Sequence, residues 1–544
     1  MKRSEFLIGA GLSVAAAAVT GSASATEPAS QPAAGKPRPL PVDTRIRVTS
    51  PPNPGTAVVE SPAGGVSEAL RMLPWLTGST LIASRVPGLA IAVVHQGKTV
   101  FAQGYGVRQI GKPGRVDTRT VFQLASLSKP IGATVVARQV SRSQVKWDTP
   151  VTALLPHFAL ADPWVTSHLT IGDCYAHRSG LPPAAGDLLE DIGYGRDYVL
   201  HHLRDEPLAP FRSSYAYANF GLTIGAEAVA RAAGIDWDTL SQQQLYGPLG
   251  MTSTSSRYRD FIARTNRAAM HAKVGKRFLP LYQRDADPQS PAGGVSSNVI
   301  DMAAWMKMVL AQGKIGHNQW IETTALLPAI SAEMIQHPAN DVLARPGQYG
   351  YGFNVGVQPG GRVTMGHSGA FAQGVGTAFT MIPSADIGIV VLTNGSPVGA
   401  AESLIASFLD IVQFGYLTRD WWKTYQPALA GLMDPVGDLV GVKPPKHPAP
   451  SAPTNALVGT YRNHYYGTAV VRRHGGILTM ELGPRHRYTF TLNHWDGSTF
   501  SFIPTGENAP AGSLSSAKFV VSHGKASAVT LQFFDAQKHG TWTR

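Results

Sequence analysis

Short apolar runs bounded by turn residues predict β-strands near both ends of the first 425 residues. Near the start, residues 86–94 and 99–102 are apolar and are separated by His95-Gln96-Gly97, a pattern that predicts a hairpin. Much later, residues 362–365, 377–382 and 387–393 form three further runs, with a turn at residues 383–386. Strands so far apart in the chain would have to pair into one antiparallel sheet.

Between these runs, the spacing of apolar residues is helical. Residues 150–345 alternate helical stretches with long loops rich in Gly and Pro. Two apolar helix faces can be named: Ile131, Val135, Val136 and Val140 after Ser126, and Leu404, Phe408, Ile411 and Val412 in a closing helix. We therefore expect an α+β domain over residues 66–425, in which helices flank an antiparallel sheet.

Beyond residue 425 the pattern changes to that of a separate domain. Residues 443–453 are rich in proline and close a predicted linker over 426–454. After it, apolar and polar residues alternate, and the apolar positions are Leu478, Met480, Leu482, Tyr488, Phe490, Leu492, Val529, Leu531 and Phe533. A period of two predicts a small all-β domain over residues 455–544, a barrel or a sandwich, and we favour the barrel.

The first residues have the pattern of an export signal. Lys2 and Arg3 precede an apolar stretch over residues 6–19, and Ala23-Ser24-Ala25 is a small-x-small cleavage site. We predict a signal peptide over 1–25, a flexible Pro/Ala-rich segment over 26–65, and a periplasmic or secreted protein. An uncleaved anchor is the alternative, but the apolar stretch is short, so we expect no stable membrane span. The second arginine of a twin-arginine signal is missing, so Sec and an atypical Tat route both stay open.

Composition excludes several other classes. The chain has 544 residues and a formal net charge of +12, yet it has no dense run of Lys and Arg, so we expect no nucleic-acid partner. The single cysteine, Cys174, excludes an intramolecular disulfide and lies in an apolar stretch typical of a buried residue. No His-Glu-x-x-His motif is present and the C-terminal histidines lack metal-ligand spacing, so we predict no metal and no cofactor.

One candidate for nucleophilic chemistry is Ser126-x-x-Lys129. On a helix these two side chains share a face, so the amine can lie beside the hydroxyl and activate it. Three other Ser-x-x-Lys matches occur, at Ser143, Ser515 and Ser522. Pro130 singles out Ser126, because proline is tolerated in the first turn of a helix and thus places this serine at a helix start.

Two further motifs follow Ser126 along the chain. Tyr217-x-Asn219 supplies a second possible base, although a buried tyrosine and a turn asparagine would explain the pair as well. His367-Ser368-Gly369-Ala370 follows a predicted strand, where glycine would let a substrate backbone approach closely. Each motif is weak alone, and their order is the informative feature.

In that order, the motifs resemble those of the penicillin-recognising serine hydrolases of the class C β-lactamase type. This family includes D-Ala-D-Ala carboxypeptidases, D-aminopeptidases and family VIII carboxylesterases. Ser-x-x-Lys, Tyr-x-Asn and Lys/His-x-Gly look like Ser126/Lys129, Tyr217/Asn219 and His367/Gly369 here. Further stretches are similar, at residues 148–156, 177–182, 248–251, 291–296 and 349–352. The last domain resembles a β-barrel of unknown function that is often appended to these hydrolases.

The resemblance implies a role for each motif. Ser126 would attack the acyl carbon, while Lys129 and Tyr217 share the proton transfers. Tyr217 is the expected base for Ser126 and later for water, although the sequence leaves open which of the two acts as base. Asn219 would hydrogen-bond the substrate. The strand that carries the third motif, His367, Ser368, Gly369 and Ala370, would bind the substrate, and the N–H groups of Ser126 and Ala370 would form the oxyanion hole.

One departure from the family pattern bears on the substrate. His367 stands where family β-lactamases usually carry a lysine, and a mostly neutral imidazole holds a carboxylate less firmly. We therefore expect an esterase or a D-amino-acid peptidase or amidase acting on a small ester, a D-peptide or a peptidoglycan fragment. The alternatives are a β-lactamase, an acyltransferase, and a non-catalytic peptidoglycan-binding envelope protein. The oligomeric state stays open, and the last domain is expected to restrict the pocket or to mediate assembly.

Overall fold

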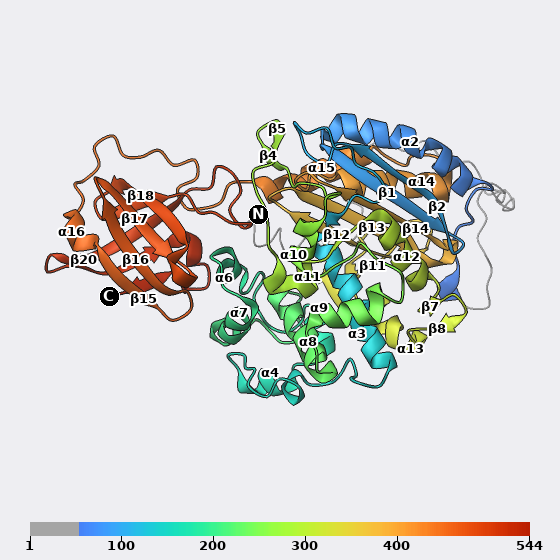
Figure 1. Ribbon diagram of the computed structural model, residues 1–544, viewed down its shortest axis with the longest axis horizontal. Helices are drawn as coiled ribbons and strands as arrows, with labels where there is room; N and C mark the ends of the chain where they lie inside the picture. Colours follow the sequence, from blue (N-terminus) through green and yellow to red (C-terminus); the bar gives the residue numbers. More distant parts are fainter. Residues whose placement is uncertain (1–53) are drawn as a thin grey trace, which may run out of the picture.

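The computed structural model describes residues 54–544, which form two domains (Figure 1). The first domain is built on a sheet of eight strands in the order β2-β1-β14-β13-β12-β11-β10-β9, and each pair of neighbours is antiparallel. The strands are β1 Gly88–His95, β2 Lys98–Gly106, β9 Met334–His337, β10 Gly347–Tyr349, β11 Asn354–Val357, β12 Val363–Phe371, β13 Val375–Ile382 and β14 Ile387–Thr393. The predicted pairing of early and late strands is confirmed, since Leu89 on β1 lies opposite Thr393 on β14.

Both faces of this sheet are covered by helices, which explains why its central strands are apolar throughout. Leu89, Ile91 and Val93 face a core shared with α2 (Gly65–Ser84) and α14 (Ala400–Phe414). The alternate residues Ala90, Ala92 and Val94 face the opposite core. Figure 1 shows α2, α14 and α15 (Trp421–Ala430) on one side of the sheet. Successive side chains of β1 therefore point alternately into two buried layers, one on each face of the sheet.

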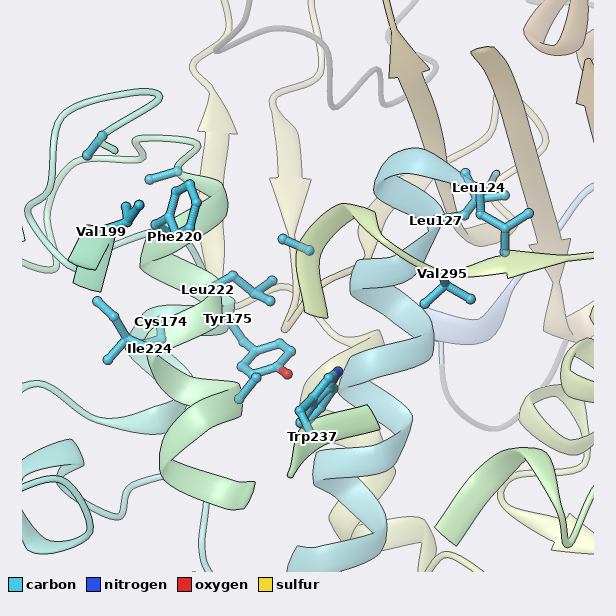
Figure 2. Close-up of a cluster of buried hydrophobic side chains, with 14 of the residues drawn as sticks. Leu124, Leu127, Cys174, Tyr175, Val199, Phe220, Leu222, Ile224, Trp237 and Val295 are labelled. Atoms are coloured by element: carbon cyan, nitrogen blue, oxygen red, sulfur yellow. The ribbon is translucent and has the colours of Figure 1, made fainter. Parts of the chain in front are cut away.

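The opposite layer holds the helices that carry the sequence motifs. They include α3 (Ser128–Ser141), α8 (Asn219–Ala233) and α12 (Val299–Leu310). In Figure 2 the rings of Tyr175 and Trp237 fill the space between α3 and α8, and Leu124, Leu127 and Val295 gather at the start of α3. The shorter helices of this layer are α4 Pro163–His168, α5 Ile171–Tyr175, α6 Asp187–Asp191, α7 Arg196–His202, α9 Trp237–Ser241, α10 Tyr258–Ala263, α11 Ser290–Gly293 and α13 Thr323–Leu326.

The second domain is a closed barrel of eight antiparallel strands, as predicted. The strands are β15 Gly459–Asn463, β16 Gly467–His474, β17 Ile477–Leu482, β18 Tyr488–Asp496, β19 Thr499–Phe502, β20 Ser515–Ser522, β21 Lys525–Leu531 and β22 Thr541–Thr543. Leu478, Met480 and Leu482 are buried in alternation with partly buried Thr479 and Glu481. The alternation ends at Leu531, because the chain turns there into a short 3-10 helix over Gln532–Phe534 that buries Phe534 rather than Phe533.

The ends of the first domain differ in detail from the predicted boundaries. The predicted signal peptide and most of the segment 26–65 lie outside the described residues. Within the described part, Val59 N already donates to Gly360 O at 2.9 Å, before α2 begins. At the other end, α15 runs past residue 425 because Trp421 and Tyr425 pack against α14 through Ala406. Among residues 54–544, no helix is both long enough and apolar enough to cross a bilayer.

Candidate active site

Ser126 lies in a tight turn that joins a short strand to α3. The strand β3 (Phe122–Gln123) pairs with β6 (Ser296–Ser297), and a 3-10 turn over Ala125–Leu127 leads directly into α3. Ala125 adopts a left-handed conformation with φ 48°, which is uncommon for a residue other than glycine. Ser128 Oγ fixes the turn by donating to Ala125 O (2.7 Å) and accepting from Val295 N (3.0 Å). The helix start predicted from Pro130 is therefore present, and Ser126 lies two residues before it.

The Ser126 hydroxyl lies between an amine and a phenol. Lys129 Nζ is 3.0 Å from Ser126 Oγ, and Tyr217 OH donates to the same oxygen at 2.7 Å. Ser126 is partly exposed, whereas Lys129 is fully buried. The turn, α3 and the segment before α8 therefore bring three predicted site residues into direct contact.

The amine of Lys129 has three hydrogen-bond acceptors around it. Nζ donates to Asn219 Oδ1 (2.8 Å), to Ala292 O (2.9 Å) and to Ser126 Oγ. Burial favours the neutral amine and lowers the pKa of Lys129 to about 7, although the charge of Asp187 opposes this shift. Near neutral pH a large fraction of Lys129 is therefore uncharged and can accept a proton.

Tyr217 stays protonated in this environment. Its ring stacks at a tilt on His177, with centroids 4.4 Å apart, and the Lys129 amine lies 4.4 Å from its ring centroid. Burial raises the pKa of Tyr217, and the hydrogen bond to Ser126 offsets this only in part. The phenol is thus neutral at neutral pH and able to donate a proton.

Asn219 connects the lysine to a buried carboxyl group. Its amide Nδ2 donates to Asp187 Oδ2 at 3.1 Å, while its Oδ1 accepts from Lys129. Asp187 begins α6 and is buried, and its pKa is raised first by burial and then by the neighbouring Glu190 and Asp191. The Asn219 side chain is therefore held in one orientation by a donor on one side and an acceptor on the other.

His367, the first residue of the third motif, is buried on β12 and is neutral. Its Nδ1 lies 2.6 Å from the carbonyl oxygen of Ser368, so Nδ1 carries the proton, and Nε2 accepts from Tyr349 OH at 2.9 Å. Burial and the charge of Lys129 lower the pKa of His367 to about 3. The position that is a lysine in many β-lactamases therefore supplies no positive charge here.

Gly369 explains why β12 can lie directly over the Ser126 turn. A Cβ atom at this position would stand 2.3 Å from Leu124 O and 2.4 Å from Thr377 Oγ1. Thr377 Oγ1 in turn donates to Leu124 O at 2.8 Å and fastens β13 to the same turn. Glycine is thus required here because the Leu124 carbonyl lies against this position of β12. The same close contact sets the position of Ala370 relative to Ser126.

Ser368 lies on the other face of the sheet. Its partner across the ladder is Ala378, which belongs to the core under α2 and α14, whereas His367 pairs with Phe379 of the opposite core. The Ser368 side chain therefore points toward Glu402 of α14 and away from Ser126. Only the backbone of Ser368 is on the side where we expected it to bind substrate.

The sequence did not assign a role to several residues that surround these motifs. Asp187 orients Asn219, His177 stacks on Tyr217, and Tyr349 fixes His367. His177 and Tyr349 lie in stretches that resemble the family, and this was the available signal. Asp187 carried no signal, because its link to Asn219 depends on a tertiary contact between the starts of α6 and α8.

One group of side chains could hold a metal ion, among the residues that the structure describes. His202, Asp205 and His464 place their potential ligand atoms within 4.8 Å of one another. Spacing along the chain could not reveal this group, because His464 comes from the barrel and the other two from the first domain. The three are already paired, His202 Nδ1 with Asp205 Oδ2 (2.8 Å) and His464 Nε2 with Asp205 Oδ1 (3.2 Å). The group therefore needs no ion to satisfy its polar atoms.

Similarity to known proteins covers both domains. Residues 56–409 match the family model described as Beta-lactamase, which is more than half of the chain. Residues 443–543 match a domain of unknown function, DUF3471. The second match begins in the proline-rich segment and includes the whole barrel.

Several curated proteins are similar in sequence. Unguisins hydrolase ungD' of Aspergillus campestris is 27% identical over 415 residues, 72% of this chain and 74% of that protein. Penicillin-binding protein 4 of Amycolatopsis lactamdurans is 27% identical over 394 residues, 69% of this chain and 93% of that protein. Esterase EstB of Burkholderia gladioli is 33% identical over 187 residues, 31% of this chain and 46% of that protein.

A solved structure shares the fold. The octameric penicillin-binding protein homologue from Pyrococcus abyssi superposes with a TM-score of 0.54 at 16% sequence identity. The match covers 87% of this chain and 100% of that one. The fold predicted from the sequence, a sheet flanked by helices with an appended barrel, is thereby confirmed.

Proposed function

Since the chain belongs to the Beta-lactamase family of serine hydrolases, we propose that it cleaves esters or amides through an acyl-enzyme formed on Ser126. The observation that carries this proposal is the position of Ser126 Oγ, 3.0 Å from Lys129 Nζ and 2.7 Å from Tyr217 OH. A serine hydroxyl becomes an effective nucleophile when a base within hydrogen-bond reach takes its proton. The turn that holds Ser126 also leaves its side chain partly exposed, where a substrate can reach it.

We assign the role of base to Lys129. Its pKa of about 7 gives a neutral amine in useful amounts at neutral pH, whereas burial raises the pKa of Tyr217 and keeps the phenol protonated. As the bond from Ser126 Oγ to the acyl carbon forms, the hydroxyl proton passes to Nζ. The bond from the acyl carbon to the leaving group then breaks, the leaving group takes the proton from Nζ with the Tyr217 hydroxyl as relay, and the acyl-enzyme remains.

Hydrolysis repeats these transfers with water. Water attacks the acyl carbon, gives its proton to the same base, and Ser126 leaves with that proton restored. Backbone N–H groups at Ser126 and Ala370 would stabilise the negative oxygen in both steps. Donors of this kind contribute roughly 3–4 kcal/mol each where they have been removed by mutation.

The third motif supports a substrate that needs no cation at this position. His367 is neutral, because its pKa is about 3 and its Nδ1–H faces the Ser368 carbonyl. A substrate carboxylate would find no partner charge there, so esters and D-amino-acid peptides or amides are favoured over β-lactams. The relative named as an esterase agrees with the ester part of this choice.

Export is a separate part of the proposal and rests on residues 1–25. Their basic start, apolar stretch and Ala23-Ser24-Ala25 site have the pattern of a cleaved signal, so the substrate would be met outside the cytoplasm. N-terminal sequencing of the protein released by the native host tests this point. A mature chain that still begins at Met1 contradicts it.

The activity is tested with the purified chain and three chromogenic probes: a short-chain nitrophenyl ester, a D-alanyl anilide and a cephalosporin. We expect turnover of the ester or the anilide, and a covalent adduct of a fluorophosphonate on Ser126. Ser126→Ala should abolish both. Ser522→Ala is the matched control, because Ser522 is an exposed serine of another Ser-x-x-Lys match and should leave both unchanged. Absence of turnover and of the adduct in the unaltered chain refutes the proposal.

A further inference from the structure

A loop of the barrel reaches into the first domain beside the candidate active site. Asp191, the last residue of α6, accepts hydrogen bonds from Glu507 N (3.0 Å), Asn508 N (3.1 Å) and Asn508 Nδ2 (2.9 Å). Gly506 makes this approach possible: its φ is +125°, and a Cβ atom there would lie 2.6 Å from Asp191 Oδ2. The loop over residues 506–508 therefore packs closely against the end of α6 and hydrogen-bonds to it.

The same loop also holds the end of β12. The Glu507 carboxylate accepts hydrogen bonds from the backbone N–H groups of Ala372 and Gln373, the latter at 3.3 Å. These N–H groups follow directly after Phe371, the last residue of β12. A carboxylate that accepts from two consecutive backbone N–H groups makes charge-assisted bonds, which are stronger than bonds between neutral groups.

The two anchoring points belong to elements that carry residues of the candidate site. The first element, α6, begins at Asp187, which orients Asn219 and through it the Lys129 amine. The second, β12, carries Ala370 only two residues before Ala372. One barrel loop thus contacts the element that positions the base and the strand that carries the proposed oxyanion donor.

Arg284 joins these contacts to the nucleophile turn. Its guanidinium is buried, lies 2.7 Å from Glu190 Oε2 and 3.6 Å from Asp191 Oδ1, and covers the ring of Phe371 at 4.7 Å. Its carbonyl oxygen accepts from Gln123 Nε2 at 2.8 Å, three residues before Ser126. The charge of Glu507 acts on the same guanidinium.

We propose that Glu507 is a positioning residue of the active site, and that the barrel completes the catalytic unit by holding the end of β12 against the Ser126 turn. This inference rests on the proposed function of Ser126. Oxyanion donors act through preorganised geometry, so freeing the strand that bears Ala370 reduces the rate even though Glu507 touches no reacting atom. Misplacement by about 1 Å can reduce a rate roughly hundredfold, and a loosened strand end should cost roughly tenfold.

The test compares Glu507→Ala and Glu507→Gln in the full chain with Glu481→Ala. Glu481 is the matched control, because it is a barrel glutamate whose ion pair with Arg472 lies within the barrel. Amide hydrogen exchange of peptides covering residues 366–376 reports the two backbone bonds directly. The rate of Ser126 labelling by a fluorophosphonate, together with kcat and KM for nitrophenyl acetate, reports the catalytic effect.

We expect faster exchange at residues 372–373 in Glu507→Ala, a roughly tenfold lower labelling rate and kcat, and a KM within about twofold, because a small acetyl ester does not reach the barrel. Glu507→Gln keeps one accepting oxygen and should give intermediate values; it replaces the alanine variant if that chain does not fold. Exchange and labelling in Glu507→Ala that equal those in Glu481→Ala overturn the inference, and Glu507→Gln takes this place if Glu507→Ala does not fold. Failure of the unaltered chain to label at Ser126 overturns the proposed function instead.

Discussion

The close approach of β12 to the nucleophile turn predicts a specific effect of Gly369→Ala. The added methyl group would stand 2.3 Å from Leu124 O and 2.4 Å from Thr377 Oγ1, about 1 Å closer than a carbon and an oxygen approach without repulsion. The carbonyl of Leu124 cannot move away freely, because Leu124 N is bonded to Val295 O and its own oxygen accepts from Thr377. Strand and turn must therefore separate by roughly 1 Å.

This separation has two measurable consequences. Overpacking of this kind costs about 1–3 kcal/mol in the free energy of unfolding. Moving the Ala370 N–H by about 1 Å from the oxygen that it stabilises should slow fluorophosphonate labelling of Ser126 roughly hundredfold, since this donor no longer reaches the phosphoryl oxygen when Ser126 Oγ bonds to the phosphorus. Urea titration measures the first quantity and active-site labelling the second.

Gly356→Ala is the matched control for this prediction. Gly356 lies on β11 of the same sheet, and a Cβ atom there would meet only Thr364 Oγ1, at an ordinary 3.4 Å. We expect this variant to keep both the stability and the labelling rate of the unaltered chain. If Gly369→Ala behaves in the same way as Gly356→Ala, the assigned contact between β12 and the Ser126 turn is wrong.

Two further predictions concern pH. Lys129 must lose its proton to act as base, and its pKa is about 7. The logarithm of the labelling rate should therefore rise with pH with a slope near one up to pH 7 and level off above it. A labelling rate that does not change from pH 5.5 to 8.5 contradicts this role. Burial raises the pKa of Glu190 from 4.5 to about 7, so its protonation contributes stability that is complete below pH 4.5 and is lost as the pH rises through 7. Glu190→Gln should remove this contribution, which is worth at most about 1.4 kcal/mol per pH unit, and urea titrations of both chains between pH 4.5 and 8 measure it. Parallel stability curves for the two chains would exclude a titrating Glu190.

The elements that carry the site could be predicted because local rules determine them. Pro130 places Ser126 at a helix start, and the apolar face of α3 follows from the 3.6-residue period. The strands β1, β13 and β14 are apolar runs bounded by turns. Their pairing could be predicted because strands near the two ends of the domain's sequence must form one sheet. The barrel follows from the alternation at residues such as Leu478 and Met480.

The remaining features depend on tertiary contacts that leave no periodic trace. The third motif suggested that Ser368 faces the substrate, but the ladder with β13 turns its side chain toward α14. We expected Gly369 to make room for a substrate backbone. In the structure, the missing side chain makes room for the Leu124 carbonyl. Asp191 and Glu507 meet only because two domains dock, and no local pattern predicts which loop of a barrel does so.

The pairing of β1 with β14 also has a consequence for how the chain folds. β1 is apolar toward both faces and needs partners on both edges, but only β2 follows it directly in the sequence. Until residues 387–393 have been synthesised, the second edge of β1 has no native partner and offers its backbone groups and its apolar side chains to other chains. Contacts between such distant segments form slowly, so this domain should pass through an intermediate that is prone to aggregation. A chaperone that binds β1 would protect this intermediate.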